Sequence, residues 1–217
     1  MTPQPDAAHA YDASGRRAAA ERSRRAVLDA GRELLLRDGY KATTIRAVAQ
    51  HAGVSPELVY KAFGSKPQLM KAVYDVALAG DDEPVPMGQR PELRAVFASA
   101  EAREALRLYA AFVYGVHERL GGLLAVLAGS DPELAAVAME TEAERLRGVS
   151  AFVDHLAAIG WLRPGLSASE GADSCWVLTS PQVFDQLMRA RAWNAETYRW
   201  WLGRMLAAAL LPDDVDS

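Results

Sequence analysis

The sequence predicts an all-α protein with a small N-terminal domain and a larger C-terminal helical bundle. Apolar residues recur at helical spacing along most of its 217 residues, and no segment alternates convincingly as a surface strand would. Residues suited to capping helices precede many of these periodic segments. An acidic stretch rich in proline and glycine, within residues 81–92, interrupts the pattern and marks the domain boundary.

The balance of charge divides the chain at the same place. Residues 15–80 hold 12 Lys and Arg against 6 Asp and Glu, whereas residues 81–217 hold 12 against 20. A basic unit beside an acidic one indicates a polyanionic partner for the first unit. We expect a disordered N-terminal arm at 1–15, a first domain at 16–80, a linker at 81–92 and a second domain at 93–217.

The composition limits the class of protein. The single cysteine, Cys175, can form no intramolecular disulfide and no cysteine metal cluster, which fits a reducing cytoplasm. No apolar run approaches the roughly 20 residues of a membrane helix, and the start of the chain lacks the apolar core of a secretory signal. We therefore expect a cytoplasmic protein without a membrane partner. Its 20 arginines against 4 lysines suggest a bacterium with GC-rich DNA.

Four helices are expected in the first domain. The first covers about residues 24–38 and ends at Gly39, where a helix C-terminus favours a left-handed residue. The next runs from Ile45 to about residue 51. The cap residues of the second, third and fourth helices are Thr43 or Thr44, Ser55 (followed by Pro56 at the first helical position) and Ser65.

The second domain is expected to be helical throughout. Helices are predicted at 101–120 and 122–129, followed by a long one within 131–159. Three more begin at Ser167 or Ser169, at Ser180-Pro181, and at Asn194.

The break at Gly53 has a specific physical reading. Gly53 permits a tight turn between two short helices, and Val59 and Phe63 form the buried face of the second. A helix-turn-helix needs this arrangement, because its second helix lies in the major groove of DNA. The opposite face of that helix carries Ser55, Pro56, Glu57, Tyr60 and Lys61.

Three flanking side chains strengthen this interpretation over that of an ordinary helical hairpin. Thr44 at a helix N-terminus, Tyr60, and Lys66 at the start of the fourth helix are all good phosphate ligands. Double-stranded DNA is therefore the expected partner of the first domain.

The stretch "GYKATTIRAVAQHAGVSPELVYKAFGSKPQLM", residues 39–70, resembles the DNA-binding domain of TetR-type transcriptional regulators. The resemblance covers the Gly-Tyr turn, the paired threonines, the Gly-Val-Ser turn, and the Tyr-x-x-Phe and Phe-x-x-Lys spacings. It implies that Thr44, Tyr60 and Lys66 grip phosphates, while Pro56, Glu57, Lys61 and Arg46 lie near bases. Leu58 departs from the family, which commonly has a threonine there, and can offer only an apolar contact such as one to a thymine methyl.

The rest of the chain is more weakly similar to the C-terminal regulatory domain of such regulators, over "GWLRPGLSASEGADSCWVLTSPQVFDQL" and "NAETYRWWLGRMLAAALL". The similarity implies a helical domain that dimerises through its last helices and holds a ligand among the earlier ones. Large apolar residues on the last helices suit a homodimer interface: Val183, Leu187, Tyr198, Trp201 and Met205.

A ligand pocket is expected between the 101–130 segment and the long helix, holding a largely apolar, uncharged small molecule. The candidate lining residues are Tyr109, Phe112, His117, Met139, Phe152, His155 and Trp176. The alternative is that these aromatic residues form the core, and that His117 beside Glu118 is solvated or capped.

These features predict a repressor that binds a pseudo-palindromic operator as a homodimer and is released by its ligand through a population shift, with the fourth helix as the lever. The sequence has no G-x-S-x-G, phosphate-binding loop, dinucleotide fingerprint or H-E-x-x-H motif, so we expect no catalytic residues, no cofactor and no metal. The alternative function is a helical small-molecule-binding or adaptor protein with weakened DNA binding.

Overall fold

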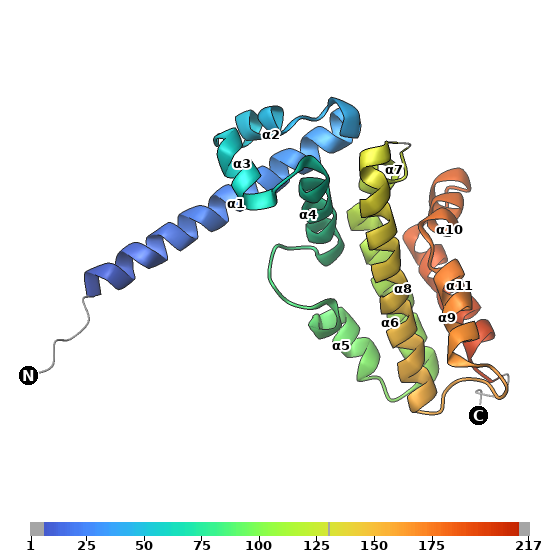
Figure 1. Cartoon of the computed structure of the whole chain (residues 1–217). Coiled ribbons are helices and arrows are strands. Elements are labelled where there is room, and N and C mark those ends of the chain that lie inside the picture. Colours follow the sequence, from blue (N-terminus) through green and yellow to red (C-terminus); the bar gives the residue numbers. More distant parts are fainter. Residues whose placement is uncertain (1–6, 130, 213–217) are drawn as a thin grey trace, which may run out of the picture. The chain divides into compact units, whose positions relative to one another are not determined.

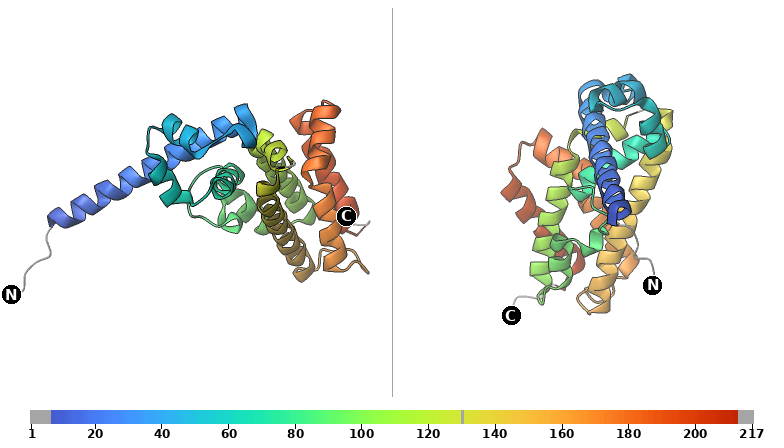
Figure 2. Two further views of the ribbon diagram at one scale, coloured as in Figure 1. Left: turned by 45° about the horizontal axis from the view of Figure 1, so that its top comes forward. Right: turned by 90° about the vertical axis from the view of Figure 1, so that its left-hand side faces the viewer.

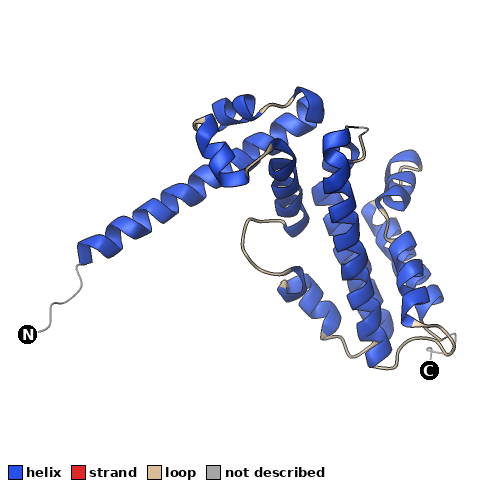
Figure 3. Cartoon of the chain, in the orientation of Figure 1, coloured by secondary structure: helices blue, strands red, loops and turns tan. Residues whose placement is uncertain are grey.

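The computed structural model describes residues 7–129 and 131–212, with side chains from Gly15 onward. Helices and short turns make up this part of the chain, and it contains no strand (Figure 3). The all-α fold class is therefore confirmed. The chain forms two compact units, one of Met1–Val76 with Ala125–Val137 and one of Ala77–Leu124 with Ala138–Ser217.

The first unit is built on four helices: α1 Ala7–Ala42, α2 Ile45–Ala52, α3 Pro56–Phe63 and the start of α4, Lys66–Ala79 (Figure 1). Its core contains Val27, Leu34, Val48, Val59 and Met70, which are almost completely buried. Burying one such side chain contributes about 1.5–3 kcal/mol, so this core, and not intrinsic helix propensity, holds the two eight-residue helices α2 and α3 in place.

The predicted caps in this unit are confirmed. The side chains of Thr44, Ser55 and Ser65 accept hydrogen bonds from the backbone N–H groups of Ala47, Leu58 and Gln68, at 3.1, 3.3 and 3.3 Å. Of the two threonines left open by the sequence, Thr44 is the cap. The hydroxyl of Thr43 instead donates to the carbonyl oxygen of Gly39 at 2.8 Å.

The start of α1 differs from the prediction. Residues 1–6 of the expected disordered arm lie outside the described residues, but α1 begins at Ala7 and therefore covers all of 7–15. Alanine and arginine are strong helix formers, and no proline interrupts residues 7–26, which explains the extension. The predicted break at Gly39 is present as a positive φ of 77° within α1.

The second unit contains the remaining helices: η1 Met87–Gln89, α5 Pro91–Phe97, α6 Ala102–Leu120, most of α8 Ala135–Ala158, α9 Ala168–Leu178, α10 Pro181–Asp185, η3 Gln186–Ala190 and α11 Ala195–Leu210. Helix α6 packs against α5 and α11, and α11 also packs against α9. Their shared core includes Leu106, Phe152, Leu156, Tyr198 and Leu206. The side chains of Ser167, Ser180 and Asn194 cap α9, α10 and α11, as predicted.

Two features between the predicted elements were not anticipated. Helix α5 follows directly on the acidic stretch, where Arg90 is buried and forms two hydrogen bonds with the Asp81 carboxylate, at 2.7 and 3.0 Å. The segment that holds the end of α7, Gly122–Leu127, and η2, Pro132–Leu134, belongs to the first unit. The domain bounds expected from the sequence, with a boundary at residue 80, stay a prediction.

Candidate nucleic-acid interface and ligand region

The turn between α2 and α3 requires a glycine. Gly53 has φ 67° and ψ 31°, a left-handed conformation that side chains with a Cβ adopt at a cost. Its conformation lets the N–H of Val54 reach back to the carbonyl oxygen of Ala49 at 3.0 Å, which closes the end of α2. Two residues after Gly53, Ser55 caps α3. The two short helices are therefore held in a fixed relation by local hydrogen bonds.

Helix α3 has one buried and one exposed face. Val59 and Phe63 are buried, while Glu57, Tyr60 and Lys61 are exposed, with 55 % of the Tyr60 surface accessible. The exposed face is polar and cationic at its C-terminal half. A helix of this size fits the major groove, which is about 12 Å wide.

The N-terminus of α3 carries an ionised carboxylate. Hydrogen bonds from the backbone N–H of Glu57 and from the Ser55 hydroxyl, followed by the positive charge of Arg46, lower the pKa of Glu57. Arg46 and Ser55 are exposed beside it, and Pro56 is half-buried. An ionised carboxylate at this position can accept a hydrogen bond from a base and repels phosphate.

Two of the expected phosphate ligands lie outside α3. Thr44 is exposed at the N-terminus of α2, where its side chain also caps the helix. Lys66 begins α4 and is half-buried, because its ammonium nitrogen lies 3.9 Å from the centroid of the Tyr40 ring. This cation–π contact fixes the position of the ammonium group.

Tyr40 connects Lys66 to a distant part of the chain. Its ring is buried, and its hydroxyl donates a hydrogen bond to the carboxylate of Glu133 in η2 at 2.8 Å. Burial and this carboxylate raise the pKa of Tyr40 well above its ordinary value, so the hydroxyl keeps its proton. The sequence analysis missed this contact, because the two residues are 93 positions apart and neither belongs to a recognisable motif.

In the second unit, the aromatic residues expected to line a pocket pack on one another. The rings of Tyr109 and Phe152 stack with centroids 3.8 Å apart, and both residues are buried. Burial raises the pKa of the Cys175 thiol, which lies against the Tyr109 hydroxyl, to about 12. The two rings fill the space between α6 and α8, so they serve the core, as the alternative interpretation had it.

Helices α6 and α9 each carry a buried polar atom without a partner. His117 is only 4 % exposed; its Nε2 donates to the carbonyl oxygen of Thr179 at 3.0 Å. Within the described part of the chain, His117 Nδ1 and Trp176 Nε1 are buried without a hydrogen-bond partner. The Arg145 guanidinium carbon lies 4.6 Å from the centroid of the Trp176 ring. The alternative interpretation had His117 solvated or capped; His117 is not solvated, and it bonds to the carbonyl oxygen of the residue that ends α9.

Burial accounts for the protonation state of His117. Removal from water lowers its pKa, and the positive charge of Arg145 acts in the same direction, against the hydrogen bond to Thr179. A neutral imidazole that donates through Nε2 carries a lone pair on Nδ1. The unpartnered atom is therefore an acceptor.

The other candidate ligand residues lie apart from this cluster. Met139 is 75 % exposed and does not face the interior, because Val137 and Thr141, two residues away on either side, occupy the buried face of α8. The prediction for Met139 is therefore wrong. The His155 ring packs edge-on against Phe97 at 5.0 Å. Phe112 lines a hollow of about 310 Å³ between α5 and α6.

The candidate dimer residues divide into two groups. Tyr198 is 0 % exposed, and its ring packs edge-on against Phe184 at 5.1 Å, so it has no surface to offer a partner and that prediction is wrong. The remaining four are half-buried: Val183, Leu187, Trp201 and Met205. Trp200, which sequence analysis passed over, is the more exposed tryptophan of α11.

Comparison with known proteins decides the family. Residues 27–73, which span the helix-turn-helix described above, match the profile of the bacterial regulatory proteins of the tetR family. This segment of the chain is a TetR-type helix-turn-helix. The match covers the turn at Gly53 and the whole of α3.

Solved structures of the same fold cover nearly the whole chain. NalD of Pseudomonas aeruginosa, the secondary repressor of the MexAB-OprM multidrug efflux pump, has a TM-score of 0.66 at 20 % identity, over 89 % of this chain and 98 % of its own. FadR of Bacillus subtilis in complex with stearoyl-CoA has 0.68 at 16 %, over 85 % and 97 %. The SmeT–triclosan complex has 0.66 at 17 %, over 90 % and 94 %. No curated protein sequence matches this chain significantly.

Two other features are absent from the part of the chain that the structure describes. No group of three or more His, Cys, Asp or Glu side chains among them could hold a metal ion. None of the helices in that part combines the length and apolar character needed to cross a lipid bilayer.

Proposed function

We propose that this TetR-family regulator is a repressor that binds a pseudo-palindromic operator as a homodimer and leaves it when a small molecule occupies the second unit. The observation that carries the DNA-binding half is the exposed face of α3, with Tyr60 and Lys61 on it and Thr44 beside it on α2. NalD, a repressor of the same fold, supports the repressor role. Two-fold symmetry of a homodimer would match inverted half-sites about one helical turn, or a multiple, apart.

The contacts to DNA divide into two groups under this proposal. Thr44, Tyr60 and Lys66 hold phosphates and set the register of the helix, while Glu57, Lys61 and Arg46 lie near base edges. Leu58 is 40 % exposed on α3 and can meet a thymine methyl. Phosphate contacts supply most of the affinity, and base contacts supply the specificity.

The ligand is proposed to bind beside His117 and Trp176. Buried polar atoms without partners are rare in native proteins, and a ligand that completes them gains hydrogen bonds the free protein lacks. Because the free atom of His117 is an acceptor and Trp176 Nε1 is a donor, the fitting molecule offers one donor and one acceptor on an otherwise apolar body. The complexes of SmeT with triclosan and of FadR with stearoyl-CoA support an apolar ligand.

Two helices are available to couple ligand and DNA. Helix α4 begins at Lys66 in the first unit and ends in the second, and α8 begins in the segment that holds Glu133 and continues into the second unit. A ligand that favours one arrangement of these helices shifts the population by its differential affinity for the two states. The hydrogen bond between Tyr40 and Glu133 adds a second connection to α4. The Tyr40 ring contacts the ammonium group of Lys66, the first residue of that helix.

Selection of bound duplexes from a random pool tests the DNA-binding half. We expect an inverted repeat, and we expect the Tyr60→Phe/Lys66→Ala variant to bind it more weakly with a shallower salt dependence. Each lost phosphate contact reduces the slope of log affinity against log salt by about 0.9. The Lys71→Ala variant is the matched control, because Lys71 forms an ion pair with Asp75 at 2.7 Å within α4. An unchanged slope in the double variant would remove Lys66 from the list of phosphate ligands, and an unchanged affinity would remove Tyr60 as well.

One observation favours the alternative of a small-molecule-binding protein with weakened DNA binding. Lys66 is engaged with Tyr40, and Leu58 offers no hydrogen bond. Under that alternative the random pool yields no enriched sequence, while compounds that raise the melting temperature of the protein are still found.

A further inference from the structure

The N-terminal part of α1 concentrates positive charge. Residues 15–26, here called the basic extension, hold five arginines against one glutamate, whereas residues 27–42 of the same helix hold three cations against three anions. The basic extension also lies before residue 27, where the match to the tetR profile begins. The profile match therefore does not account for the charge of the basic extension.

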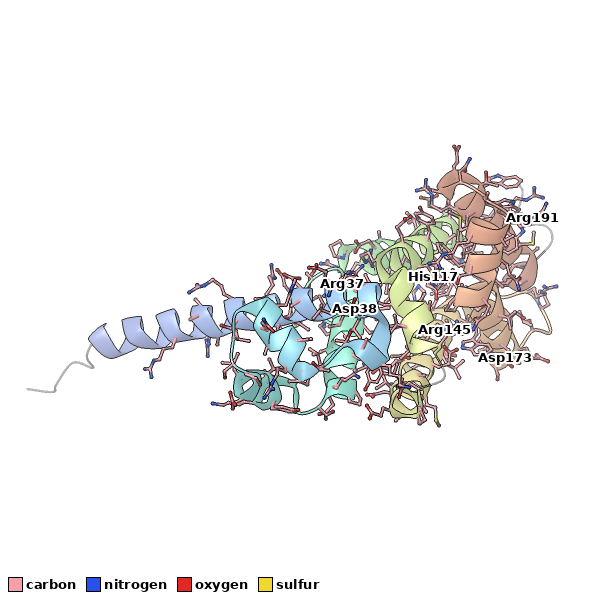
Figure 4. All side chains as sticks on the ribbon, turned by 90° about the horizontal axis from the view of Figure 1, so that it is seen from above. Arg37, Asp38, His117, Arg145, Asp173 and Arg191 are labelled. Carbon is pink, nitrogen blue, oxygen red and sulfur yellow. The ribbon has the colours of Figure 1, made fainter. Side chains whose placement is uncertain are left out.

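The side chains of the basic extension are not needed by the core. Arg16, Arg17, Arg22 and Arg25 are exposed, and only Arg24 is half-buried among the five. Near the other end of α1, the Arg37 guanidinium lies 2.8 Å from the Asp38 carboxylate (Figure 4). A helix surface with this excess of arginine repels itself unless it meets a polyanion.

The position of Arg24 shows where the basic extension lies in the first unit. Its guanidinium carbon is 5.0 Å from the centroid of the Phe63 ring, at the C-terminal end of α3. From Arg24 back to Gly15, an α-helix advances about 13 Å, which exceeds half the roughly 12 Å width of the major groove. The helix therefore projects past the end of α3 (Figure 1, Figure 2), far enough to reach beyond the groove in which α3 would lie.

We propose that the basic extension binds the phosphate backbone of the DNA that flanks the half-site contacted by α3, as an anchor that does not depend on sequence. This inference rests on the proposed function, because it needs α3 to lie in the major groove. A membrane surface is the less suitable partner, since the sequence GRRAAAERSRRA has no large apolar residue to insert into lipid. Arginine is the residue that best pairs with phosphate in two parallel hydrogen bonds.

The test compares two duplexes. The first ends at the outer edge of each half-site of the selected operator, and the second carries ten further base pairs of random sequence on each side. We expect the wild-type protein to bind the longer duplex at least tenfold more tightly at low salt. The Arg17→Gln/Arg22→Gln/Arg25→Gln variant should lose that preference, and its salt slope on the longer duplex should fall by up to about 2.7 for each bound chain.

A matched control separates this effect from a change of overall charge. The Arg94→Gln/Arg147→Gln/Arg191→Gln variant removes three exposed arginines from the second unit and should keep the preference for the longer duplex. Glutamine and arginine have similar helix propensities, and circular dichroism checks that both variants keep their helical content.

Two results would overturn the inference while leaving the proposed function in place. One is equal affinity of the wild-type protein for the two duplexes. The other is a triple variant of the basic extension that weakens binding to both duplexes by the same factor. Failure of the wild-type protein to bind either duplex would overturn the proposed function, and this inference with it.

Discussion

Glu57 is a carboxylate at the start of a helix that is proposed to meet a polyanion. Its lowered pKa keeps it ionised, so it weakens every phosphate contact nearby and is useful only if it recognises a base. A carboxylate accepts hydrogen bonds, and the amino group of cytosine is the base donor that suits it in the major groove. Glu57 is therefore the side chain of α3 that we expect to carry specificity for a base pair.

The Glu57→Gln variant tests this role. We expect tighter binding to random DNA, because a negative charge is removed, and a loss of discrimination at one base pair by about 1–3 kcal/mol. Competition between the selected operator and single-base variants measures both effects. If discrimination is unchanged at every position, Glu57 contacts no base.

His117 predicts a pH dependence of stability. Its pKa is lowered in the folded protein, so between the folded value and the ordinary value of 6.5 the unfolded chain binds more protons. The stability contributed by neutral His117 is therefore fully present above pH 6.5 and is lost as the pH falls below it. Urea unfolding at pH 7.5 and 5.5 should show a smaller loss for His117→Gln than for the wild type. Equal losses would mean that His117 is already charged in the fold.

Local sequence was sufficient to predict helix caps, but not the direction in which a helical side chain faces. Thr44, Ser55 and Asn194 were identified as caps because a cap acts within three residues of its own position. Met139 and Tyr198 were assigned wrongly, because apolar character does not say which way a helical side chain faces. That direction depends on the helix packed against it, which periodicity alone does not identify.

At the scale of the elements, the α2–α3 turn depends on the backbone of one residue. Gly53 has a positive φ, and a Cβ added there would meet nothing within 4 Å, so substitution costs strain and no clash. We expect Gly53→Ala to destabilise the protein by about 1–2 kcal/mol, which lowers the melting temperature by roughly 2–8 °C in a chain of this size.

Gly148 provides the matched control for this prediction. It lies inside α8 with open space around it and no positive φ, so Gly148→Ala should stabilise the helix by up to about 1 kcal/mol. Calorimetry on the two variants gives shifts of opposite sign if the turn is as described. A Gly53→Ala variant as stable as the wild type would contradict the left-handed turn.

The helices were predictable to within a few residues wherever a cap or a glycine marks them. The beginning of α1 was missed because its alanines and arginines, although good helix formers, show no apolar periodicity. The whole of α5 was missed because a stretch rich in proline indicates disorder unless a contact holds it. For α5 that contact is the partly buried ion pair between Arg90 and Asp81, which no local pattern indicates. The candidate pocket was expected where the Tyr109 and Phe152 rings stack, because periodicity cannot distinguish a filled core from a cavity.

The two units differ in charge, and the chain passes between them more than once. The first is basic and carries the helix-turn-helix, while the second is acidic and holds buried polar atoms that lack hydrogen-bond partners. Segment 125–137 belongs to the first unit although its neighbours in sequence belong to the second. The chain therefore passes between the units three times, which offers a ligand more than one route to the DNA-binding surface.

Hydrogen exchange measured with and without the selected operator tests the central claim, that the exposed face of α3 and its flanking residues contact DNA. We expect slower amide exchange in peptides that cover residues 44–66 when the duplex is added, and little change in peptides from α5 or α11. Slower exchange confined to the second unit, with residues 44–66 unaffected, would contradict it.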